Sequence, residues 1–159
     1  LVLTYWRQYM FKKILIAFGF VLMTFSQNVN EAKAESMKPL ISVLNQEQSA
    51  SMFVYAFERC SGLFNVLYAR FSNYNKPEYK QIADIMLNEA SIASIGALNS
   101  AKAAGLNLTT EKTIEKSLGF AKRYGTMMDR HMQNTGNAIS PVVENDQSLC
   151  MELNKLVKK

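Results

Sequence analysis

The sequence has 159 residues, of which 48% are hydrophobic and 19% are charged. This length fits a single domain, and this composition supports a packed core and excludes wholesale disorder. The formal net charge of +5 is concentrated near the N-terminus: residues 35–159 hold 14 Lys and Arg against 12 Asp and Glu, which leaves +2. The sequence has no basic stripe with interleaved aromatic residues, so nucleic acid is not expected as a partner.

The first 34 residues have the order of a secretory signal peptide. Two lysines closely follow Met10, a run of 12 apolar residues comes next, and the tripeptide AKA ends at Ala34. The run is too short for a transmembrane helix, which needs ~20 apolar residues. We expect residues 1–34 to be an upstream extension (residues 1–9) and a signal peptide cleaved after Ala34. An uncleaved membrane anchor is the alternative.

Cleavage would release a single domain of residues 35–159 into the periplasm or the medium. Contact with the membrane is then expected only through the signal peptide, before cleavage.

Apolar spacing predicts four helices in this domain. They span about residues 39 or 46 to 72, then 77–104, 110–134 and 142–158. The first carries an apolar seam with spacings of 4, 3, 4, 3 and 4: Phe53, Phe57, Cys60, Phe64, Leu67 and Phe71. Short turns between amphipathic helices predict an all-α fold, an antiparallel up-down-up-down four-helix bundle.

The other helices show similar stripes and end signals. The second half of the second helix is rich in Ala, Ser and Gly, which lets a neighbouring helix approach closely. In the third helix the apolar stripe predicts these buried residues: Ile114, Leu118, Ala121, Met128 and Met132. Gly105 is the expected C-terminal cap of the second helix, and Thr109 or Thr110 the expected N-cap of the third.

Cys60 and Cys150 are the only cysteines in the sequence. An even number of cysteines in an exported chain predicts a disulfide, with free core thiols or a catalytic thiol as alternatives. Counting outwards equally from each predicted turn places Cys60 level with about Glu152, two residues from Cys150. The first and fourth helices are neighbours in such a bundle, so the topology independently favours a Cys60–Cys150 bridge.

Three polar residues form a candidate site inside the predicted bundle. Glu89 falls on the apolar face of the second helix, and Arg59 flanks the seam of the first at the same height. We expect a partly buried ion pair between them, because a charge at the edge of a core needs a partner. Tyr124 lies nearby in height. A salt bridge that only fixes the register, or two side chains that reach solvent separately, would explain the same pattern.

A second candidate site combines soft ligands. His131, the only histidine, lies in the segment MMDRHM, and Met128 and Met86 fall on the expected inner faces of their helices. Methionine and histidine bind copper and serve as axial ligands of haem iron. An exported bundle with haem held in this way would resemble cytochrome b562 in architecture, although no sequence motif is shared. Ordinary core packing is the simpler interpretation of methionines at helical spacing.

We therefore expect a non-enzymatic binding, adaptor or structural protein, with no catalytic residue, resident metal or cofactor assigned. The partner would be an unidentified protein or a second copy of the chain. Aromatic residues around the first predicted turn are candidates for such a surface: Tyr55, Tyr68, Tyr74, Tyr79, Phe64 and Phe71. Ordinary core packing, with the tyrosine hydroxyls at its solvated edge, would explain the same residues. A haem or copper carrier is the alternative, and a hydrolase or lyase that uses Arg59, Glu89 and Tyr124 is the third possibility.

Overall fold

The described residues of the chain, 37–46 and 49–158 in a computed structural model, form five α-helices and no strand. The helices are α2 (Leu40–Leu44), α3 (Ala50–Ser72), α4 (Pro77–Ala103), α5 (Thr110–Thr135) and α6 (Pro141–Val157). The all-α prediction and the four long helices are confirmed. The predicted signal peptide lies outside the described residues.

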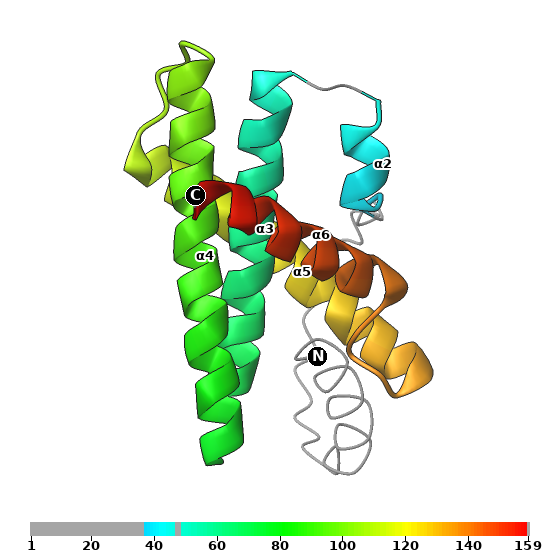
Figure 1. The fold of residues 1–159 in the computed structure, drawn as a ribbon. Helices are drawn as coiled ribbons and strands as arrows, with labels where there is room; N and C mark the ends of the chain where they lie inside the picture. The colour runs from blue at the N-terminus through cyan, green and yellow to red at the C-terminus, as the bar shows by residue number, and fades with distance from the viewer. Residues whose placement is uncertain (1–36, 47–48, 159) are drawn as a thin grey trace. The chain divides into compact units, whose positions relative to one another are not determined.

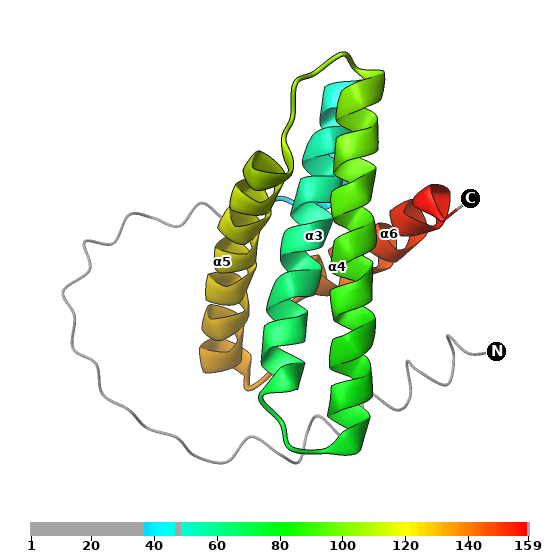
Figure 2. The same ribbon diagram turned by 90° about the vertical axis from the view of Figure 1, so that its left-hand side faces the viewer.

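Helix α3 is the centre of the fold. It packs most extensively against α4, next against α5, and also against α6 and α2. Figures 1 and 2 show that α3, α4 and α5 run in alternating directions, whereas α6 crosses α3 and α4 obliquely on the side away from α5. The first three long helices therefore follow the expected up-and-down order, and the fourth is tilted across them.

Helix ends follow the local chemistry of the sequence. Ser49, Thr109 and Ser140 cap α3, α5 and α6, because each side-chain oxygen accepts a hydrogen bond from a backbone N–H in the first turn. After α4 and α5 the chain turns at Gly105 and Gly136, whose φ angles of 67° and 74° lie in the left-handed region that glycine adopts without strain.

Small residues allow the close packing of α3 on its neighbours. Helix α4 buries a row of small side chains: Ala83, Ala90, Ala93, Gly96, Ala97 and Ala101. A Cβ atom added at Gly96 would lie 2.6 Å from the ring of Phe57. At Gly62 the backbone of α5 comes equally close, because an added Cβ would lie 2.5 Å from the carbonyl oxygen of Ser117. Both contacts leave no room for a side chain.

The apolar stripe predicted for α5 is partly wrong. Ile114 and Leu118 are 51% and 58% exposed, while Thr113 and Ser117 are buried in their place. The backbone of α5 lies directly against Gly62 of α3. This contact fixes how α5 is rotated about its own axis, and the rotation turns Thr113 and Ser117 inwards. Only the later part of the stripe reaches the core, where Met128 is buried.

None of the helices within residues 37–46 and 49–158 is both long and apolar enough to cross a membrane.

Candidate functional site

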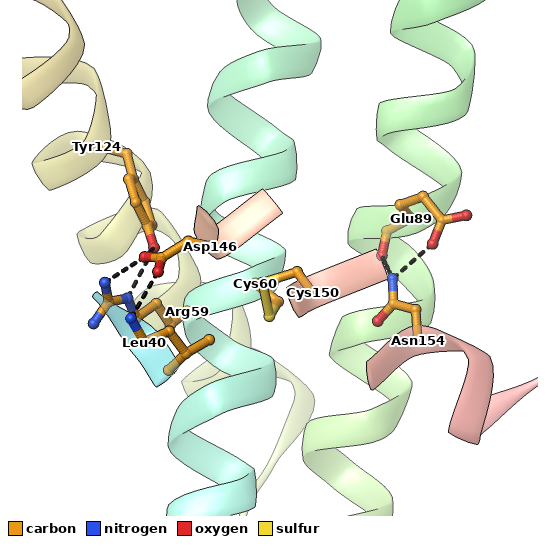
Figure 3. The surroundings of a disulfide bond; sticks show 8 residues. All are labelled: Leu40, Arg59, Cys60, Glu89, Tyr124, Asp146, Cys150 and Asn154. Atoms are coloured by element: carbon orange, nitrogen blue, oxygen red, sulfur yellow. Dashed lines mark hydrogen bonds and ion pairs between the residues drawn. A yellow bond between two sulfur atoms is a disulfide. The ribbon is translucent and has the colours of Figure 1, made fainter. Parts of the chain in front are cut away.

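Three buried polar side chains from three helices meet at the edge of α3. Arg59 of α3, Tyr124 of α5 and Asp146 of α6 are 1%, 0% and 0% exposed. We call these three residues the Arg59 cluster. Figure 3 shows them gathered next to the N-terminal residue of α2, Leu40. A buried charge is costly unless it is paired and hydrogen-bonded, so their mutual contacts decide what the cluster does.

Every member of the cluster is held by other protein groups. Asp146 accepts hydrogen bonds from the guanidinium group of Arg59 and from the hydroxyl of Tyr124. The other oxygen of Asp146 accepts the backbone N–H of Leu40 at 2.6 Å. Arg59 Nε donates to Tyr124 Oη at 2.8 Å, and its Nη2 donates to the carbonyl oxygen of Lys38 at 2.6 Å. The cluster thereby ties four helices together.

The electrostatics keep Arg59 and Tyr124 each in one protonation state. Burial raises the pKa of Tyr124, the nearby Asp146 raises it further, and Arg59 offsets this only in part. Burial alone would lower the pKa of Arg59, but Tyr124 and Asp146 outweigh that effect and the net direction is upwards. Arg59 therefore stays a cation and Tyr124 a neutral donor at physiological pH.

Glu89 belongs to a second cluster, on the α4 side. Asn154 Nδ2 donates to the Glu89 carbonyl oxygen at 2.9 Å and to its Oε2 at 2.8 Å, and Lys158 Nζ forms an ion pair with Oε1 at 2.7 Å. We call Glu89, Asn154 and Lys158 the Glu89 cluster. The expected ion pair between Arg59 and Glu89 is therefore wrong, because each residue has found a partner on α6 instead.

The disulfide between Cys60 and Cys150 lies between the two clusters, as Figure 3 shows. The predicted pairing of these cysteines is confirmed. Cys60 directly follows Arg59 in α3, while Cys150 lies one helical turn from both Asp146 and Asn154 in α6. One covalent bond and two polar clusters thus fix α6 to the α3–α4 pair at successive points along its length.

Asp146 is the residue that sequence reasoning missed. It lies three residues after Val143 and four before Cys150, on the apolar stripe that forms the buried face of α6. A carboxylate on an apolar stripe was the signal that singled out Glu89, and the same signal applies to Asp146. Together with the predicted disulfide, it would have placed Asp146 close to Arg59.

The soft ligands are distributed over two helices. Met128 is buried and His131 half-buried, one turn apart on α5, whereas Met86 is buried on α4. Helices α4 and α5 make few contacts with each other, since α3 lies between them (Figure 2). Within the described residues, no group of three or more His, Cys, Asp or Glu side chains could hold a metal ion.

The aromatic residues form two separate groups. At the turn between α3 and α4, Tyr79 packs against Phe71 and Tyr74 with ring centroids 6.1 Å and 4.8 Å away. Tyr55 instead packs edge-on against Phe120 of α5 at 5.3 Å. Phe64 is fully buried in the core. Five of the six residues expected to share one surface are therefore divided between the core, the turn and the contact with α5.

Comparison of the chain with protein families, with curated proteins and with solved structures finds no match.

Proposed function

We propose that residues 35–159 are an exported, non-enzymatic helical domain that acts by binding through its surface, on a four-helix bundle whose last helix is tilted. The observation that carries this proposal is the closure of the Arg59 cluster. A catalytic residue must reach its substrate, but Arg59, Tyr124 and Asp146 are buried and occupied by one another. Their arrangement suits the fixing of helices rather than chemistry.

Two further features support the proposal. A disulfide that closes a 90-residue separation is typical of a chain that folds in an oxidising compartment, which agrees with the signal-peptide pattern. The periplasm or the medium is therefore the proposed location. Large apolar side chains at the surface, among them Ile114 and Leu118, offer contact area to a protein partner.

Intact-mass measurement of the chain expressed with its N-terminal segment in a Gram-negative host tests the proposal. We expect a denatured mass that begins at Glu35 and that gains two hydrogen atoms on reduction. A retained N-terminal segment would contradict export. A larger native mass that returns to the bare chain on denaturation would reveal a bound cofactor and favour the haem or copper carrier.

Enzymatic chemistry is tested by the variant Glu89→Gln. A hydrolase or lyase that uses Glu89 would lose its activity and its pH–rate profile in this variant while remaining folded. We expect the variant to alter only stability.

A further inference from the structure

Helix α5 presents an apolar stripe that the rest of the described chain leaves partly uncovered. The spacing of its members is 4, 3 and 4 residues, as in the seam of a coiled coil: Ile114, Leu118, Ala121 and Gly125. Ile114 and Leu118 are more than half exposed. Ala121 and Gly125 are half-buried, and a Cβ atom added at Gly125 would lie 3.6 Å from Val66 Cγ2, so this end of the stripe borders α3. Figure 2 shows α5 at one edge of the α3–α4 pair, with α6 on the opposite side.

The order of side-chain sizes along the stripe makes it self-complementary. Its first two residues are large and its last two are small. In an antiparallel pair of α5 helices related by a two-fold axis, Ile114 of one copy faces Gly125 of the other, and Leu118 faces Ala121. Each layer then combines a large residue with a small one, which is how facing positions interdigitate at native packing density.

Charge selects the same register independently. Glu115 and Lys122 flank the stripe one heptad apart, and both are exposed. Glu115 and Lys122 directly follow Ile114 and Ala121, so they occupy the e positions that flank the stripe. In an antiparallel coiled coil, e positions of the two helices lie opposite each other. With Ile114 opposite Gly125, this rule brings Glu115 of one copy to Lys122 of the other, twice by symmetry.

Neither flanking charge forms a salt bridge with another described residue. Lys116, on the side of α5 away from the stripe, pairs with Glu58 of α3, with 3.6 Å between Lys116 Nζ and Glu58 Oε1. Lys116 therefore serves the contact with α3, while Glu115 and Lys122 remain available to a partner.

We propose that the protein forms a two-fold symmetric dimer through α5, in which Ile114 and Leu118 of each copy pack on Gly125 and Ala121 of the other. Reciprocal Glu115–Lys122 ion pairs fix the register. This dimer rests on the proposed function, since it supplies the partner of a surface-binding protein. The contact covers about three helical turns, which places it among small interfaces, so the dimer dissociates on dilution.

Sedimentation equilibrium of the oxidised chain from residue 35, over about 1 µM to 1 mM, tests the dimer. We expect the mass to rise from one chain to two chains across this range. Leu118→Glu should abolish the rise, because it places a carboxylate in the central layers. Leu156→Glu is the matched control, since Leu156 of α6 is 60% exposed and lies on another helix. This control should dimerise like the unmodified protein.

Charge reversal tests the register. Glu115→Lys and Lys122→Glu should each weaken dimerisation at least tenfold, because each brings like charges together twice, and the double variant should restore it. All four residues changed in these tests are exposed, and unchanged circular dichroism and melting temperature establish that each variant is folded. A monomer at 1 mM overturns the proposal. So does a dimer that survives Leu118→Glu, or single reversals that the double variant fails to rescue.

The two proposals can fail separately. The intact-mass measurement determines the first residue and the redox state of the chain. Sedimentation equilibrium determines the mass of protein that is already folded and oxidised. A secreted monomer would contradict the dimer alone.

Discussion

Asp146 is the single carboxylate on which the Arg59 cluster depends. It accepts hydrogen bonds from Arg59, Tyr124 and the backbone of Leu40, and all four residues are buried. Removal of one partner from a buried ion pair leaves the other charge uncompensated, which is far more costly than the loss of a surface pair.

We predict that Asp146→Asn lowers the free energy of unfolding by about 3–5 kcal/mol, because it leaves the Arg59 cation buried without its carboxylate. Urea unfolding followed by circular dichroism measures the change. Glu144→Gln, an exposed change on the same helix, should remain within about 0.5 kcal/mol of the unmodified protein. Equal effects of the two substitutions would show that the cluster adds nothing specific.

Replacement of the pair by apolar residues should behave differently from its rupture. The double variant Arg59→Met with Asp146→Leu removes both charges, so we expect it to recover most of the stability that Asp146→Asn loses. The hydroxyl of Tyr124 and the backbone N–H of Leu40 would then lack their acceptor, so Tyr124→Phe in the same background should recover part of the remainder. Additive losses in place of recovery would contradict this account.

Glu58 of α3 is another buried carboxylate, and its environment penalises the charge. Burial raises the pKa of Glu58 above its ordinary value, and Lys116 offsets this only in part. A folded-state pKa above the unfolded value gives a stability contribution that is present at low pH and lost as the pH rises through the folded pKa. At neutral pH the ionised Glu58 therefore costs stability.

We predict that Glu58→Gln raises the melting temperature at pH 7, since glutamine resembles the protonated acid. The difference should shrink towards zero as the pH falls below about 4.5, where the unmodified side chain is also neutral. Thermal melts from pH 3 to pH 8 measure both curves, with exposed Glu144→Gln as the control. A constant offset at every pH would mean that packing rather than ionisation causes the change.

At the scale of elements, the approach of α5 to α3 is set by one glycine. A Cβ atom at Gly62 would meet the Cβ of Phe120 and the backbone of Ser117 at 2.5 Å, and backbone atoms cannot move aside like the end of a side chain. The rotation of α5 that exposes Ile114 and Leu118 follows from this contact.

We predict that Gly62→Ala costs about 1–3 kcal/mol through overpacking, although alanine favours a helix more than glycine does. Gly119→Ala is the matched control within α5, where an added Cβ meets nothing within 4 Å. This control should stabilise the protein by up to about 1 kcal/mol, since only helix propensity acts. Chemical denaturation of both variants should give opposite signs, and a gain for both would contradict the close contact.

The helices and their ends could be predicted from the sequence because apolar spacing, prolines and capping residues act locally. The rotation of α5 could not, because Ile114 and Leu118 fit an inward stripe as well as Met128 does, and only the distant Gly62 decides between them. The predicted ion pair between Arg59 and Glu89 was wrong for a related reason. Counting residues along the helix axes gives the height of a residue in the bundle, but not the direction in which its side chain points around the axis. The tilt of α6 then brought Asp146 within reach of Arg59 and Asn154 within reach of Glu89.

At the scale of the whole domain, the disulfide joins α3 to α6 through two cysteines that are 90 residues apart in the sequence. In the chain-entropy model, a loop of this size restricts the unfolded chain by an amount worth about 4–5 kcal/mol. This is comparable with the entire stability of many domains.

We predict that Cys60→Ala with Cys150→Ala lowers the free energy of unfolding by about 4–5 kcal/mol, and that reduction of the unmodified protein has a similar effect. Urea titration with and without reductant measures both. A loss below about 1 kcal/mol would mean that the Arg59 and Glu89 clusters hold α6 in place without the covalent bond.

The same bond turns residues 60–150 into a covalent ring that contains all of α4 and α5 and both turns that flank α4. A protease that cuts either turn opens the ring but releases no fragment, because the two pieces remain joined through sulfur. The nicked halves stay at a high effective concentration for each other and can keep their helices paired. In a compartment that contains proteases, a protein cut once in either turn therefore stays one covalent molecule with its helices paired.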